Sequence, residues 1–252
     1  MLKTGIAIIT IFGLIFGCGK DSGYNSSGSY SPGSGTGGTG KAGSLARFAI
    51  VGNYLYALDE NDLVCYDISA PNNPVLKKRQ NVGFRIETIY PYQDKLFIGA
   101  QTAMYAYSIA DPASPQLISM VSHVRACDPV VVQGNYAYVT LRSGTVCGGS
   151  NTLNVYNVSN SAAPQLLKTI SIPSPVGLGI QGNALYVTTT GGIRLFNISV
   201  PDNPVAVADI AENGATDVIP YNNTLIVQLA AGAAFYDISN ELSPVFQSRI
   251  NQ

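Results

Sequence analysis

The sequence contains no tryptophan and only one histidine, His123, among its 252 residues. Charged residues make up 12% of the chain, about half the usual share, and the formal net charge is −1. Such weak and balanced charge offers no electrostatic attraction for DNA, RNA or an anionic membrane surface. One histidine without a C-x-x-C pair cannot supply the four ligands of a zinc site. We therefore expect no bound nucleic acid, no metal site and no cofactor.

The amino terminus has the pattern of an export signal. Lys3 precedes an apolar run, Gly5–Phe16, which is too short to span a bilayer of roughly 30 Å as a helix. A small residue stands directly before Cys18, and this stretch resembles a bacterial lipobox. The resemblance implies cleavage before Cys18 and attachment of a diacylglyceryl group to its sulfur. Residues 1–17 are thus predicted to be a lipoprotein signal peptide.

Residues 18–44 are predicted to be a flexible linker anchored by that lipid. Gly, Ser and Thr dominate this stretch, which cannot bury enough apolar surface to offset the entropy cost of ordering it. A linker of this length has a mean reach of roughly 25–30 Å. Gly19 follows the cysteine, so no acidic residue occupies the position that commonly retains lipoproteins at the inner membrane. The pattern favours the bacterial outer membrane, facing either the periplasm or the cell surface.

From Leu45 onward the sequence repeats about every forty residues. A three-residue landmark recurs five times at intervals of 41, 49, 40 and 40 residues, and a proline follows each landmark at constant spacing. The landmarks begin at Asp67, Ser108, Asn157, Asn197 and Asp237, and the prolines are Pro74, Pro115, Pro164, Pro204 and Pro244. The chain is therefore an array of five similar units.

Each unit reads as four strands, because a two-residue polar turn followed by alternating apolar residues predicts a hairpin and a strand. The third unit predicts the strands Pro129–Gln133, Tyr136–Leu141, Thr152–Asn157 and Gln165–Ile170. A four-stranded repeat of forty residues is typical of a propeller blade. Residues 45–252 are thus predicted to form an all-β, five-bladed β-propeller with four antiparallel strands per blade. No strand is shared between the first and last units, so side-chain packing between them is expected to close the ring.

The repeat also resembles a known family. The pattern "GNYAYV…LNVYNVSN…P" joins a landmark, an aromatic strand and a trailing proline, and it resembles the LVIVD repeat of bacterial and archaeal envelope proteins. The resemblance extends over residues 45–252. It implies a β-propeller and brings no assigned activity.

The third unit is longer than its neighbours by eight or nine residues, and the surplus lies around Arg142–Asn151. This stretch contains Cys147, and Cys127 stands at the start of the innermost strand of the same blade. In an antiparallel blade the end of the second strand lies beside the start of the first. We therefore predict a Cys127–Cys147 disulfide, which an exported protein permits and which would contribute roughly 3 kcal/mol. Cys65 lies inside a strand and is expected to be a buried, unreactive thiol.

Acidic residues recur at the start of the innermost strands. Aligning the units on their hairpin turns places Glu87, Asp128 and Asp217 around one mouth of the central channel. Three carboxyl groups there could act as general acid, base and orienting group in glycan hydrolysis. Neighbouring arginines could instead pair with them in a merely polar channel. Whether the channel binds a cation stays open.

Two functions of different class follow from these features. The first is a non-enzymatic binding or scaffold propeller, lipid-anchored in the envelope, which presents its rim or channel mouth to a protein, peptide or glycan. Its predicted binding residues are Arg85, Glu87, His123, Arg125, Asp128, Arg142 and Asp217. The alternative is a glycan hydrolase with Glu87, Asp128 and Asp217 as catalytic residues. We favour the binding protein, since the chain has no tryptophan to stack on a sugar and the resemblance to the LVIVD repeat brings no such activity.

Overall fold

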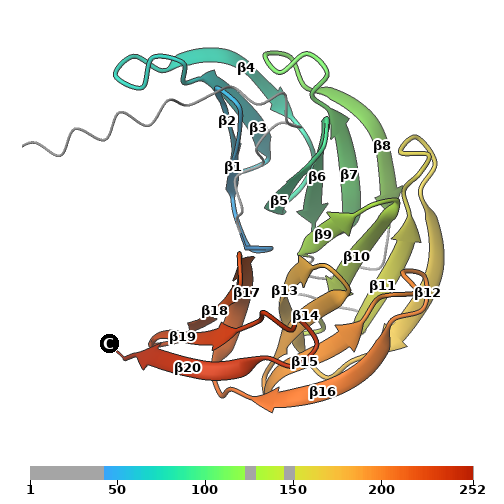
Figure 1. Ribbon diagram of the computed structural model, residues 1–252. Helices are drawn as coiled ribbons and strands as arrows, with labels where there is room; N and C mark the ends of the chain where they lie inside the picture. Colours follow the sequence, from blue (N-terminus) through green and yellow to red (C-terminus); the bar gives the residue numbers. More distant parts are fainter. Residues whose placement is uncertain (1–42, 123–128, 145–150, 252) are drawn as a thin grey trace, which may run out of the picture. The chain divides into compact units, whose positions relative to one another are not determined.

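The computed structural model describes residues 43–122, 129–144 and 151–251. These residues form twenty strands in five sheets, each of four antiparallel strands. The sheets surround a common axis as the blades of a propeller, and the first strand of each lies nearest the axis (Figure 1). The predicted all-β, five-bladed propeller is confirmed. Within the described ranges, no helix is long and apolar enough to cross a membrane.

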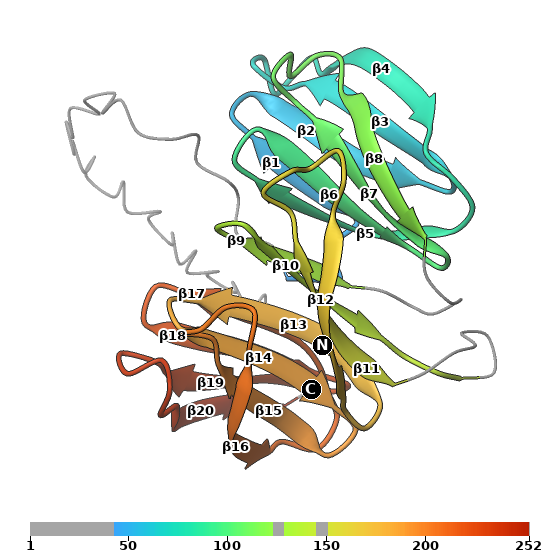
Figure 2. The same ribbon diagram turned by 90° about the vertical axis from the view of Figure 1, so that its right-hand side faces the viewer.

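The blades are numbered 1 to 5 in chain order. The inner strands are β1 (Phe48–Val51), β5 (Ile86–Tyr92), β9 (Val130–Gln133), β13 (Pro175–Gln181) and β17 (Ala215–Tyr221). The second strands are β2 (Tyr54–Asp59), β6 (Lys95–Ala100), β10 (Tyr136–Leu141), β14 (Ala184–Thr189) and β18 (Thr224–Leu229). The third strands are β3 (Asp62–Asp67), β7 (Ala103–Ser108), β11 (Thr152–Asn157), β15 (Gly192–Asn197) and β19 (Gly232–Asp237). The outer strands are β4 (Val75–Asn81), β8 (Gln116–Ser122), β12 (Gln165–Ser171), β16 (Val205–Ala211) and β20 (Val245–Ile250). Figure 2 shows the blades from the side, each twisted between its inner and outer strands.

The landmark of each repeat ends the third strand with a side-chain turn. In blade 4 the Asn197 side-chain oxygen accepts a hydrogen bond from the backbone N–H of Ser199 at 2.8 Å. The equivalent Asp or Asn makes the same bond in blades 1, 3 and 5, and Ser108 makes it in blade 2. Such side chains mimic a backbone turn. The short polar landmark therefore marks the reversal from the third to the outer strand.

Apolar packing between neighbouring blades forms the core. Four clusters of buried side chains each join two consecutive blades, from the pair 1 and 2 to the pair 4 and 5. A tyrosine on the second strand reinforces three of these junctions by donating its hydroxyl to a backbone carbonyl of the next blade. These bonds run from Tyr56 to Pro112 at 2.8 Å, from Tyr138 to Pro201 at 2.9 Å and from Tyr186 to Glu241 at 2.7 Å.

The seam between blade 5 and blade 1 differs from these junctions. Among the residues that the structure describes, no apolar cluster contains members of both blades. Figure 1 shows their sheets meeting near the channel and diverging outward. The prediction that side-chain packing closes the ring was therefore wrong. Hydrogen bonds from the residues before β1 join the two blades instead, as described next.

Candidate functional site

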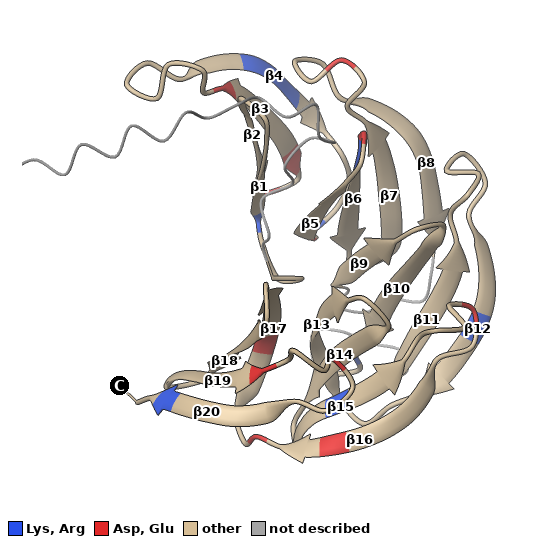
Figure 3. Cartoon of the chain, in the orientation of Figure 1, with Lys and Arg blue, Asp and Glu red and all other residues tan. Residues whose placement is uncertain are grey.

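The predicted site surrounds the channel on the side where the inner strands begin, here called the strand-start side. Arg47 lies there, exposed, with its guanidinium 3.4 Å from the Leu58 carbonyl oxygen. Half-buried Glu87 accepts a hydrogen bond from the Gln101 amide at 3.3 Å. Charged residues are scattered over the blades in Figure 3, with no band of one sign around the channel. The described residues of this side therefore carry charges of both signs in scattered positions.

Asp217 on β17 is buried, with only 3% of the residue exposed. Its carboxylate accepts hydrogen bonds from the Ser44 hydroxyl at 3.0 Å, from the Leu45 N–H at 3.3 Å and from the Val218 N–H at 2.9 Å. Burial raises the pKa of Asp217 to about 6, against the lowering effect of these donors. Asp217 was predicted to face an open channel mouth as a binding or catalytic residue. The structure corrects this position, because a carboxylate enclosed by backbone and Ser44 cannot reach a ligand.

The residues that enclose Asp217 form a bridge across the strand-start side, Gly43–Ala46. Ser44 joins blade 5 to blade 4, because its hydroxyl also accepts a hydrogen bond from the Leu178 N–H at 2.6 Å. The Ala46 carbonyl accepts one from the Ile89 N–H of blade 2 at 2.9 Å. Gly43 has no room for a side chain, since a Cβ there would collide with the Asp217 carboxylate. The bridge therefore fastens the start of blade 1 to three other blades.

The structure also describes Arg85 and Arg142, two further residues that were predicted to bind a ligand. Arg85 follows Phe84 in the loop before β5 and places its guanidinium 5.4 Å from the centre of the Phe84 ring. Its backbone has a positive φ of 50° and its N–H donates to the Asn61 side chain at 2.9 Å. Arg142 is half-buried directly after β10. The structure thus places these two arginines on loops of different blades on the strand-start side.

Several predictions fall outside the described residues. His123, Arg125 and Asp128 belong to the segment 123–128, which also contains Cys127. Cys147 belongs to the segment 145–150, so the Cys127–Cys147 disulfide lies outside the description, as does lipidation at Cys18. The structure does place the surplus of blade 3 between β10 and β11, as predicted. In the described part of the chain, no three His, Cys, Asp or Glu side chains are grouped to hold a metal ion.

Cys65 on β3 is a buried free thiol, as expected. Its sulfur lies 3.3 Å from the Pro112 carbonyl oxygen of blade 2 and donates a weak hydrogen bond to it. Burial raises the pKa of the thiol to about 11, and the charge of Asp67 adds to this effect. Cys65 is therefore a packing residue of the junction between blades 1 and 2, with no nucleophilic thiolate at neutral pH.

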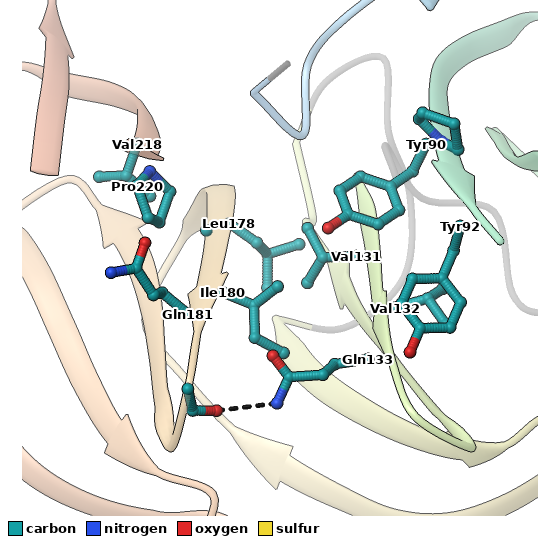
Figure 4. A pocket seen from close by; sticks show the side chains of 13 residues that line it. Tyr90, Tyr92, Val131, Val132, Gln133, Leu178, Ile180, Gln181, Val218 and Pro220 are labelled. Carbon is teal, nitrogen blue, oxygen red and sulfur yellow. Dashed lines mark hydrogen bonds between the residues drawn. The ribbon is translucent and has the colours of Figure 1, made fainter. Parts of the chain in front are cut away.

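A cavity of about 280 Å³ lies at the opposite mouth, where the inner strands end. We call it the strand-end pocket. Its walls come from the ends of β5, β9, β13 and β17, and every lining side chain is uncharged (Figure 4). Half-buried Ile180 and the ring of half-buried Tyr90 provide its accessible apolar surface, because Val131, Leu178 and Val218 are at most 1% exposed. The volume is just below the range of small-molecule sites, so the pocket suits one or two side-chain-sized groups.

Polar atoms in the strand-end pocket come from tyrosines and glutamines. Burial, assisted by neighbouring Tyr92, raises the pKa of Tyr90 to about 12, so its hydroxyl stays a neutral donor at physiological pH. Figure 4 shows this hydroxyl directed toward Val131 and Leu178. The Gln181 amide nitrogen donates to the Asn222 carbonyl at 2.6 Å, whereas its buried Oε1 has no partner among the described residues. Gln133 donates to the Gly182 carbonyl at 2.8 Å.

The sequence analysis missed these pocket residues. Tyr92, Gln133 and Gln181 occupy equivalent positions, each directly before the hairpin turn of its blade. Aligning the repeats placed the acidic residues on the strand-start side. The same alignment could have identified these polar, uncharged side chains at the strand-end pocket. The side chains that line the strand-end pocket are uncharged, although the Glu241 carboxylate accepts a hydrogen bond from the Asn183 N–H beside it.

A family model described as the LVIVD repeat matches residues 40–82 and 125–171. These two segments contain all four strands of blade 1 and all four strands of blade 3. The chain is a five-bladed β-propeller that contains LVIVD repeats. Blades 2, 4 and 5 of this LVIVD propeller share the landmark and the four-stranded topology of the matched blades. No curated protein matches the sequence.

Solved structures similar to the LVIVD propeller share its fold at low sequence identity. A functionally unknown protein from Desulfotomaculum acetoxidans is 11% identical, with a TM-score of 0.67 over 85% of this chain and 69% of that one. The periplasmic gluconolactonase PpgL of Pseudomonas aeruginosa is 12% identical, with a TM-score of 0.62 over 79% and 68%. BamB from Moraxella catarrhalis is 13% identical, with a TM-score of 0.53 over 81% and 62%. These likenesses support the propeller fold alone.

Proposed function

We propose that this LVIVD propeller is a non-enzymatic binding protein of the bacterial envelope, which holds an uncharged, extended peptide segment of a partner in the strand-end pocket. Envelope location and lipid anchoring rest on the apolar run Gly5–Phe16 and on Cys18. The similar fold of a protein named as a periplasmic gluconolactonase is compatible with this location.

The observation that carries the proposal is an uncharged pocket with Tyr90 on one side and, on the other, Gln181, whose Oε1 has no partner among the described residues (Figure 4). A buried acceptor without a partner is costly, and turning the Gln181 side chain into the pocket would let a ligand N–H satisfy it. The Tyr90 hydroxyl can donate to a ligand carbonyl. A peptide backbone supplies both groups, and half-buried Ile180 and the Tyr90 ring offer an accessible apolar contact for a side chain.

The hydrolase alternative has weaker support. Catalysis by two carboxyl groups needs both of them beside the scissile bond. Asp217 is enclosed by the bridge Gly43–Ala46 and lies at the channel mouth opposite to the strand-end pocket. No carboxylate lines that pocket. We therefore infer a binding role and no enzymatic activity.

Selection from a phage-displayed library of short random peptides tests the proposal. We expect enrichment of peptides that have an uncharged core and an apolar side chain. Gln181→Leu should weaken binding of a selected peptide at least about tenfold, because the acceptor for the ligand N–H is lost. Gln247→Leu on exposed β20 makes the same exchange away from the pocket and should bind like the parent.

Two results would count against the pocket. One is equal binding by the parent and by Gln181→Leu and Tyr90→Phe. The other is enrichment of acidic or basic peptides, which would place recognition at the charged loops of the strand-start side. A parallel glycan array completes the comparison, since glycan binding that survives both pocket variants would also overturn the proposal.

A further inference from the structure

The inner strand of each blade is an edge strand, because it pairs with another strand of its sheet on one side only. In an antiparallel pair, residues that exchange hydrogen bonds with the partner strand alternate with residues whose backbone groups point away from it. On β13, Gln181 closes the hairpin by pairing with Ala184, so Leu178 and Ile180 are the residues whose N–H and C=O turn to the channel. The inner edge of β13 therefore offers hydrogen-bonding groups to a segment that lies in the channel.

The bridge Gly43–Ala46 shows that such edges bind a segment of chain. The Leu178 N–H donates to the Ser44 hydroxyl at 2.6 Å. From the equivalent position of β5, the Ile89 N–H donates to the Ala46 carbonyl at 2.9 Å. The protein thus already holds one of its own segments through inner-strand N–H groups of two blades.

Ile180 lies two positions further along the same edge, where it is half-buried in the wall of the strand-end pocket. Its N–H and C=O point the same way as those of Leu178, because backbone directions in a strand repeat every two residues. Within the ranges that the structure describes, neither group of Ile180 has a hydrogen-bond partner. The edge of β13 is therefore occupied by the bridge on the strand-start side and open at the strand-end pocket.

The other walls of the pocket do not offer the same pair of groups. The residues equivalent to Ile180 are Pro91 on β5, Val132 on β9 and Pro220 on β17. A proline has a C=O but no N–H to donate. Val132 is 1% exposed, so its backbone is far less accessible than that of Ile180. Ile180 is therefore the pocket residue best placed both to donate to a ligand backbone and to accept from it.

We infer that the partner peptide binds as an added β-strand on β13, with one peptide residue exchanging two backbone hydrogen bonds with Ile180. This inference rests on the proposed function and names the class of segment that the pocket takes. The paired residue needs a free backbone N–H, so proline and N-substituted residues are excluded at that position. Pairing with a free sheet edge is an established way to bind extended peptides. Gln181, the next residue on β13, and Tyr90 across the pocket are left to bond the flanking peptide groups (Figure 4).

The variant Ile180→Pro tests this pairing, because it removes the N–H that faces the channel. Proline suits the fold at this position, since Pro91 and Pro220 occupy it in two other blades. Ile180→Val is the matched control, because valine has as many side-chain carbons as proline and keeps the N–H. Binding of a peptide from the phage selection to the full-length protein is followed by fluorescence anisotropy. Ile180→Pro should raise the dissociation constant at least about tenfold relative to Ile180→Val.

A second measurement alters the peptide in place of the protein. N-methylation of the selected peptide, one residue at a time, removes one backbone N–H in each step. We expect one position where the methyl group weakens binding to the parent at least about tenfold but weakens binding to Ile180→Pro much less, because that variant has already lost the pairing. If Ile180→Pro does not fold, the scan on the parent decides alone, and a loss below about threefold at every position would overturn the inference.

The outcomes separate this inference from the proposed function. If Ile180→Pro binds the peptide as tightly as Ile180→Val, pairing on β13 is refuted. Weaker binding by Gln181→Leu and Tyr90→Phe in the same assay would then leave the proposed function standing. If the selection enriches no peptide, or if none of these variants weakens binding, the proposed function fails and the inference fails with it.

Discussion

The junction between blades 3 and 4 and the seam between blades 5 and 1 are built from equivalent strands but differ in what fills them. At the junction, Tyr138 is buried and its hydroxyl donates to the Pro201 carbonyl of the next blade. At the seam, Ile226 occupies the same position with no hydroxyl and no apolar cluster around it. Inside the seam, polar bonds to Asp217 take the place of apolar packing.

This difference shows that a repeat determines its interfaces only together with its neighbours. The two faces of an internal blade are covered because the next copy of the repeat presents the complementary face. The terminal blades keep the same pattern, with Phe48 and Phe235 still apolar, although neither belongs to an apolar cluster among the described residues. Terminal repeats that must remain exposed usually have polar outer faces, and these two do not.

The largest expected effect is at an internal junction. Tyr138→Ala should lower the free energy of unfolding by about 3–5 kcal/mol, because it removes a buried ring and leaves a cavity between blades 3 and 4. It also leaves the Pro201 carbonyl without its donor. Urea unfolding followed by circular dichroism measures the change. A loss under about 1 kcal/mol would mean that the junctions are no tighter than the seam.

A smaller effect concerns Asp217. Its pKa is raised to about 6 by burial, so the folded protein holds a proton that the unfolded chain has released between about pH 4 and pH 6. This contribution to stability is complete below the unfolded pKa and is lost as the pH rises through about 6. The unfolding free energy of the parent, measured relative to that of Asp217→Asn, should therefore fall by roughly 1–3 kcal/mol between pH 4 and pH 7.

The comparison with Asp217→Asn is necessary because other carboxyl groups act in the opposite direction. Hydrogen bonds from Arg194 lower the pKa of Asp209, and those from Ser69 and Ser239 lower the pKa of Asp67 and Asp237. Taking the difference between the parent and the variant cancels these common contributions. Parallel pH curves for the two proteins would show that Asp217 does not titrate in this range.

The smallest expected effect is at the seam. Ile226→Ala should cost less than about 1 kcal/mol when unfolding is measured on dilute protein, since the half-buried side chain has little packing to lose within one chain. A loss of about 2 kcal/mol or more would instead indicate that blades 5 and 1 pack within one molecule.

Strand positions could be predicted from the sequence because local chemistry fixes both ends of each strand. In blade 3 the predicted second and third strands coincide with β10 and β11, and the others differ from β9 and β12 by one residue at one end. The Gly134–Asn135 turn and the Asn157 landmark supply these boundaries. Glycine suits this turn, where residue 134 has a positive φ of 59°.

The contents of the site could not be predicted in the same way. Nothing in the local sequence around Ser44 shows that it would meet Asp217, which is 173 positions away. Asp217 was predicted to be a channel residue, because aligning the five repeats gives the position of a residue along the channel axis. The alignment does not show which other residues cover its side chain. The same holds for Gln181 in the strand-end pocket. Its side-chain oxygen lacks a partner because of how the neighbouring blades are arranged, which the local sequence does not show.

The bridge Gly43–Ala46 has a mechanical consequence. Any tension on the chain that precedes Gly43 enters the propeller at Ser44, whose hydroxyl is bonded to the last inner strand and to the one before it. A pull would load these short hydrogen bonds before it reaches the strands of blade 1. Force along the linker would therefore break the hydrogen bonds between blades 5 and 1 first and leave the four packed junctions intact.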